Sequence, residues 1–103
     1  MTTIDIVRTD DAIELTASDH AGNKVMCAVC SANVCNLINI CEKELNEHRL
    51  DYLRWDVSSG FSRVEAKCFP EFKERFNAIC DMVIVAFDSL AEKYSDNFRI
   101  TIR

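Results

Sequence analysis

The sequence predicts an α+β domain, β-β-α-β-β-α-β, with two long helices packed on one face of a single mixed or antiparallel sheet. Short segments in which apolar and polar residues alternate are typical of strands, and they occupy 3–9, 13–17, 52–57, 61–66 and 98–103. Two longer segments, 25–47 and about 70–94, instead have apolar residues every three or four positions, as amphipathic helices do. This order favours one layer of helices on one sheet.

The chain opens as a predicted β-hairpin, because Asp10-Asp11 is a turn signal between two alternating segments. The polar segment 18–24 follows and contains His20 and Gly22, so it is the natural loop between a strand and a helix. Asn23 is suited to cap that helix. The helix is expected to bury one stripe, made of Met26, Cys30, Val34, Leu37, Ile38, Cys41 and Leu45. Glu42, Lys43, Glu44 and Asn46 are expected at its solvent-exposed end.

The second half repeats this pattern. Ser58-Ser59-Gly60 separates two strand-like segments and predicts a hairpin turn, with Gly where a positive φ is needed. Pro70 is placed where a second helix can begin. Ile84 and Val85 widen the apolar face of that helix beyond the single stripe a core needs, which makes it a candidate dimer surface.

Composition narrows the class of protein. A length of 103 residues predicts one domain, 1–103, and a net charge of −5 argues against direct nucleic-acid binding. The same charge favours a basic protein partner. Uninterrupted apolar runs are short and no signal peptide is recognisable, so we expect a cytoplasmic protein without membrane contact. Six cysteines in that setting predict reduced, mostly buried thiols.

Cys27 differs from the other cysteines because it falls in the first turn of a predicted helix, directly after the loop that carries His20. A helix N-terminus favours the thiolate form of a cysteine, and an imidazole nearby can take the proton. First-turn N–H groups can also receive a developing oxyanion. Ser31 lies one turn later on the same face and either contacts this site or bonds back to the helix. Asp19 either orients His20 or is a solvated carboxylate.

Other interpretations of these cysteines remain open. A lone cysteine near a lone histidine in a small protein is more often incidental than catalytic, so Cys27 as a packed residue and His20 as a solvated loop residue is one alternative. Cys27-Ala-Val-Cys30 also has the C-x-x-C spacing of a dithiol redox pair, although Pro or Gly is missing between the cysteines. A zinc site is less expected because no second C-x-x-C or paired His follows.

The segment from Asp19-His20-Ala21-Gly22 to Val25-Met26-Cys27-Ala28-Val29-Cys30-Ser31-Ala32 resembles the signature of the ribosomal-processing cysteine proteases, the Prp family. That signature runs Gly-His-Ala, a variable loop, an apolar pair and Cys-Ala-x-x-Ser. The resemblance implies His20 and Cys27 as the catalytic dyad. It implies Ser31, Asp19, Ala21, Gly22 and Ala28 as supporting residues.

The resemblance further implies removal of the short N-terminal extension of a large-subunit ribosomal protein, in a homodimer that needs no cofactor and no metal. The sequence departs from the family pattern at three points: Asp19 replaces the Gly, Lys24 replaces an acidic residue, and the loop from His20 to Cys27 is short. An inactive, ribosome-associated binding module of the same fold is therefore the alternative to a protease.

Overall fold

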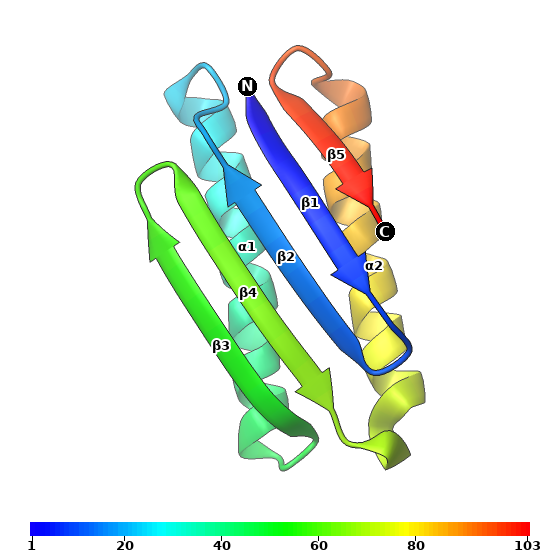
Figure 1. The fold of residues 1–103 in the computed structure, drawn as a ribbon. Helices are drawn as coiled ribbons and strands as arrows, with labels where there is room; N and C mark the ends of the chain where they lie inside the picture. Colours follow the sequence, from blue (N-terminus) through cyan, green and yellow to red (C-terminus); the bar gives the residue numbers. More distant parts are fainter.

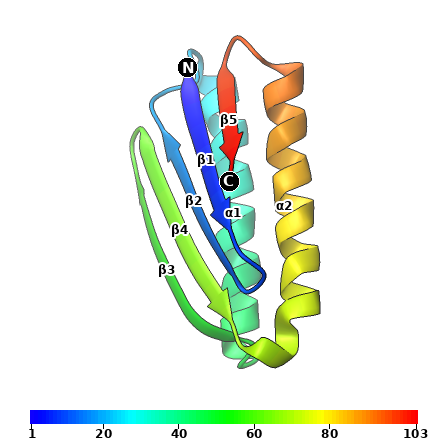
Figure 2. The ribbon, with the colours of Figure 1, turned by 45° about the vertical axis from the view of Figure 1, so that its right-hand side comes forward.

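A computed structural model describes residues 1–103 and confirms the predicted fold class (Figure 1). The elements are β1 (Thr2–Arg8), β2 (Ala12–Ser18), α1 (Lys24–Asn46), β3 (Leu50–Ser58), β4 (Phe61–Cys68), α2 (Lys73–Lys93) and β5 (Phe98–Ile102). A short 3₁₀ turn, Pro70–Phe72, leads into α2. All five strands form one sheet in the order β3-β4-β2-β1-β5, and both helices cover the same face of it (Figure 2).

The sheet is mixed because its last strand runs parallel to its first. β1 pairs with β2 in antiparallel fashion and with β5 in parallel fashion, while β2–β4 and β3–β4 are antiparallel. The pairing of Ser18 with Phe61 aligns the end of β2 with the β3–β4 hairpin turn. The register therefore brings the His20 loop beside Gly60.

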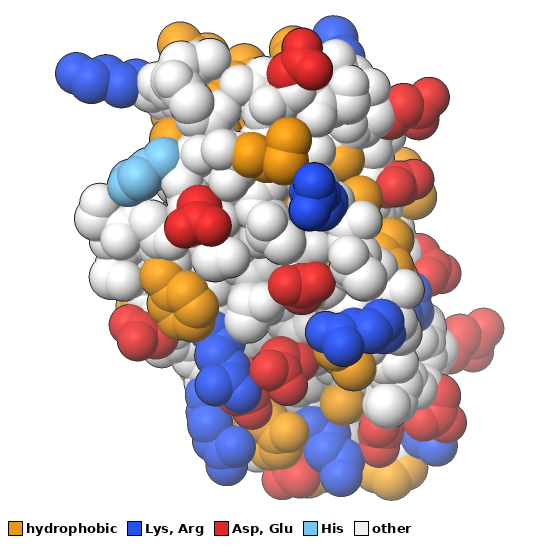
Figure 3. Space-filling view, turned by 45° about the horizontal axis from the view of Figure 1, so that its top comes forward, with side chains coloured by type: hydrophobic (Ala, Val, Ile, Leu, Met, Phe, Trp, Pro, Cys, Tyr) orange, Lys and Arg blue, Asp and Glu red, His pale blue; other side chains and the backbone are white.

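The core lies between the sheet and the helix layer. Every second residue of the central strands is buried there, including Ile4, Ile6, Leu15 and Val64. The residues between them face the other side of the sheet, where acidic and basic side chains alternate with scattered apolar ones (Figure 3). This difference between the two faces explains the alternation in the sequence.

Helix α1 begins as the sequence predicts, since the Asn23 side chain accepts a hydrogen bond from the Met26 N–H at 2.8 Å. The predicted stripe is buried from Cys30 to Cys41. By length and composition alone this helix is long and apolar enough to cross a membrane, but its apolar stripe packs on the sheet, as in a core helix.

The last turn of α1 corrects two predictions. Leu45 was expected in the core but is 37% exposed, whereas Glu44 was expected in solvent but is only 5% exposed. Glu44 lies one turn after Cys41 on the core-facing side, and the next residue is rotated about 100° away. The buried carboxylate is satisfied because it accepts hydrogen bonds from Arg49 and Arg75. Glu44 therefore links the end of α1 to the start of α2.

Candidate active site at the start of helix α1

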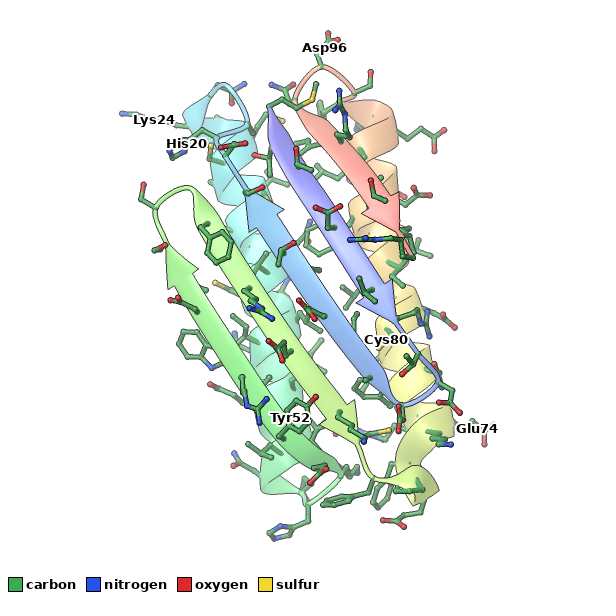
Figure 4. The ribbon with its side chains drawn as sticks, viewed as in Figure 1. His20, Lys24, Tyr52, Glu74, Cys80 and Asp96 are labelled. Atoms are coloured by element: carbon green, nitrogen blue, oxygen red, sulfur yellow. The ribbon has the colours of Figure 1, made fainter.

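The structure brings His20 and Cys27 together. His20 follows the end of β2, and Cys27 is in the first turn of α1. The Cys27 Sγ lies 4.0 Å from His20 Nδ1. Figure 4 shows His20 and Lys24 at the same end of the molecule, where α1 starts. Direct proton transfer needs about 2.6–3.2 Å, but such pairs are often looser before substrate binds. The thiol and the imidazole thus lie near one another, at a separation that a small side-chain movement would close.

The surroundings of Cys27 are a backbone donor and a helix N-terminus, both of which interact favourably with anions. The backbone N–H of Ala21 donates a hydrogen bond to Sγ at 3.3 Å, and the positive end of the helix lies beside it. Two first-turn N–H groups are already used, because Asn23 accepts from Met26 and from Cys27. The predicted oxyanion donors are therefore restricted to the backbone N–H groups that come before these two in the helix.

The loop that carries His20 is attached to three separate strands or turns. The Asp19 N–H donates to the Gly60 carbonyl at 2.8 Å, and the Thr2 hydroxyl donates to the Asp19 carbonyl at 3.0 Å. The Asn97 side chain donates to the Ala21 carbonyl at 2.5 Å. Asp19 has a φ of +70°, a conformation that Gly adopts readily and that Asp tolerates better than most residues. Asp19 thus adopts a left-handed backbone conformation at the position where the signature that the sequence resembles has Gly.

Gly60 touches the other side of the His20 ring. Its φ is +76°, and a Cβ built on it would lie 3.2 Å from His20 Nε2. The absence of a side chain lets the β3–β4 turn approach the imidazole closely. The ring therefore lies between the hairpin turn and Cys27, with Nδ1 toward the thiol and Nε2 toward the hairpin.

Beside the two residues lies an open pocket of about 200 Å³. It is lined by Thr2, Ala17, Asp19, His20, Cys27, Cys30, Ser31, Ser58, Ser59, Gly60, Phe61 and Ser62. Of the predicted supporting residues, Ser31 and Asp19 line this pocket, and Ala21 contributes its N–H to Cys27. Gly22 forms the turn of the loop with a φ of +98°, and Ala28 lies on the exposed face of α1, outside the pocket lining.

The other thiols differ chemically from Cys27. All six cysteines are free, and four of them are buried, as predicted from composition. Burial raises the pKa of the Cys30 thiol, and the nearby Cys27 raises it further. The interpretation of Cys27 and Cys30 as a redox pair stays open on these observations.

Sequence reasoning missed three contributors to the site: Thr2, Asn97 and the contact of Gly60 with His20. Thr2 and Asn97 are far from His20 in the sequence and act only through the parallel pairing of β1 with β5, for which no local signal exists. The contact of Gly60 with His20 could have been predicted, because two paired hairpins align their ends once their register is known.

The sequence matches no protein-family model and no curated protein sequence. Solved structures do resemble it. Prp from S. aureus, an essential ribosomal processing protease, aligns over 100% of both chains in two crystal structures. Its structure with a covalently linked product peptide aligns with a TM-score of 0.72 and 22% sequence identity. Its structure with a substrate peptide aligns with a TM-score of 0.72 and 15% sequence identity. SMU.848 from Streptococcus mutans gives 0.71 at 21% identity, covering 99% of this chain and 93% of that chain. This chain therefore has the fold of the ribosomal processing protease Prp, which confirms the predicted resemblance at the level of the fold.

Proposed function

We propose that this protein is a cytoplasmic cysteine protease that removes a short N-terminal extension from a large-subunit ribosomal protein. The observation that carries the proposal is the arrangement of Cys27 Sγ, 4.0 Å from His20 Nδ1 and hydrogen-bonded by the Ala21 N–H, at the start of a helix. Acyl transfer by cysteine needs a thiolate, a base within reach and donors near the reacting carbonyl.

The reaction follows from these atoms. His20 Nδ1 takes the proton of the Cys27 thiol, and the sulfur attacks the carbonyl carbon of the peptide. The peptide C–N bond then breaks, the amine leaves with the proton from His20, and the acyl group stays on Cys27 as a thioester. His20 next takes a proton from water, whose oxygen attacks the thioester and releases the carboxylic acid and the free thiol.

The proposed substrate rests on three supports. The S. aureus protease of this fold was crystallised with a substrate peptide and with a product peptide. The net charge of −5 on this chain favours encounter with a basic ribosomal protein. The pocket beside Cys27 is open, so an extended peptide terminus can enter it without unfolding of the protein.

The test is cleavage of the organism's own ribosomal-protein precursor, followed by intact-mass spectrometry. Cys27→Ala is expected to reduce cleavage at least about 10³-fold, because it removes the nucleophile. Cys35→Ala is the matched control, since Cys35 is an exposed cysteine on the same helix that does not line the pocket. Equal cleavage by Cys27→Ala and Cys35→Ala would refute the proposal. A wild-type protein that binds the precursor without cutting it would support the alternative, an inactive binding module.

We also propose that the protein is a homodimer through the outer face of its helix layer. Met82 and Val85 of α2 are 73% and 63% exposed, far more than apolar side chains of a helix packed on both sides. A shallow groove of about 140 Å³ lies between the helices, and Ile40, Met82 and Phe87 are among its lining residues. Exposed apolar patches of this kind mark interaction surfaces.

A further inference from the structure

The pocket beside Cys27 has an uneven distribution of charge. Asp19 is the one acidic residue in its lining, and no Lys or Arg lines it. The hydrogen bonds of Asp19 are made by its backbone, to Gly60 and Thr2, so its exposed carboxylate has no partner in the protein. Lys24, the nearest cation in the sequence, is exposed and forms no ion pair with it. The pocket lining thus includes one acidic residue without a protein partner, directly before His20 in the chain.

The backbone that carries this side chain is held in place. A φ of +70° is unfavourable for a residue with a side chain, and such conformations persist where surrounding contacts enforce them. Here the contacts are the 2.8 Å and 3.0 Å hydrogen bonds on either side of the Asp19 peptide. A ligand that pairs with this side chain therefore loses less conformational entropy than it would with a side chain on a freely moving loop.

The rest of the pocket suits a long side chain with a charged end. Four serines, Ser31, Ser58, Ser59 and Ser62, supply small neutral walls with hydroxyl groups. Ala17 and Phe61 supply apolar surface. Lysine and arginine bury their methylene stems on apolar surface while the charged group stays in a polar environment.

We propose that Asp19 is a specificity residue of this site, and that it selects peptides with a lysine or arginine side chain close to the cleaved bond. The inference rests on the proposed protease function and adds a substrate class to it. Both Asp19 and the pocket are open to solvent, so the preference is moderate. Exposed ion pairs contribute at most about 1 kcal/mol. We therefore expect a three- to five-fold preference, close to the largest that such a pair gives.

The test uses fluorescein-labelled decapeptides that span the precursor junction, in pairs that carry either lysine or Nε-acetyl-lysine at one position. Binding is measured by fluorescence anisotropy on Cys27→Ala, which does not turn over, alone and combined with Asp19→Asn. Asp96→Asn is the charge-matched control, because Asp96 is exposed at the same end of the molecule but does not line the pocket (Figure 4).

The expected result is a three- to five-fold tighter binding of the lysine peptide at one position. This ratio should fall to about one in Asp19→Asn, persist in Asp96→Asn, and shrink as salt is raised. A ratio that is unchanged by Asp19→Asn, or the absence of any lysine preference, overturns the inference.

Cleavage of the same peptides by the protein with Cys27 intact separates the two proposals. Cleavage without lysine preference overturns the role of Asp19 and leaves the protease standing. Lysine preference in binding without cleavage supports the role of Asp19 as a peptide-binding residue and refutes the protease. If Asp19 acts instead through His20, Asp19→Asn changes cleavage of both peptides by the same factor, which also overturns the inference.

Discussion

Gly60 allows the geometry of the His20–Cys27 pair to be tested without changing either residue. In Gly60→Ala the new methyl carbon would lie 3.2 Å from His20 Nε2, closer than the roughly 3.5–4.0 Å at which nonbonded carbon contacts are favourable. The ring must retreat by several tenths of an ångström, and its exposure lets it turn toward solvent and away from Cys27. Misplacement of a reacting group by about 1 Å costs about 10²-fold in rate, so we expect a 10- to 100-fold fall in kcat/KM.

The same substitution also strains the backbone, because φ at Gly60 is +76° and a left-handed residue with a Cβ costs about 1–2 kcal/mol. Gly22→Ala is the matched control for this strain. Its φ is +98°, but the added Cβ would meet only the Asn97 side chain, at 3.4 Å. Urea unfolding should show a loss of stability in both variants, and peptide cleavage by the folded fraction should fall further in Gly60→Ala. If Gly60→Ala cleaves as fast as wild type, His20 is not held in place by this contact, and our account of the site is wrong.

Two further predictions concern the assembly and the core. Met82→Glu places a charge on the exposed apolar face of α2 and should shift the protein from dimer to monomer in sedimentation velocity, whereas a wild-type monomer would contradict the proposed interface. Burial raises the pKa of Cys41 to about 12, with smaller contributions from Cys80 and Glu44, against 9.0 for the free thiol. The unfolded chain therefore loses this proton above about pH 9 while the folded chain keeps it. The free energy of unfolding should fall by up to about 1.4 kcal/mol per pH unit from this group. Between about pH 8 and 10.5, the free energy of unfolding measured in urea should fall less steeply with pH for Cys41→Ala than for wild type. Equal slopes would refute the assignment of the raised pKa to Cys41.

Periodicity was sufficient to predict the strands and helices, because the sheet has one buried face and each helix packs one stripe against it. The order of His20, a short polar loop and Cys27 predicted that these two residues lie close together, since they stand at adjoining ends of one strand and one helix. The burial of Glu44 and the exposure of Leu45 were predicted wrongly. A carboxylate can be buried once Arg49 and Arg75 neutralise it, and those partners come from other elements. Hydropathy alone carries no information about such partners.

The short loop between His20 and Cys27 has a structural consequence for the site. The loop between β2 and α1 is short. It is fixed to the sheet and to the β3–β4 turn because it accepts hydrogen bonds from Thr2 and Asn97 and donates one to the Gly60 carbonyl. A loop attached in this way holds His20 near Cys27 before substrate arrives, so binding does not have to supply the free energy of ordering it. It also leaves the pocket open, so less water is excluded during reaction than a closing loop would achieve. Selection among peptides must then come from the fixed walls of the pocket, and Asp19 is the residue in those walls that carries a negative charge.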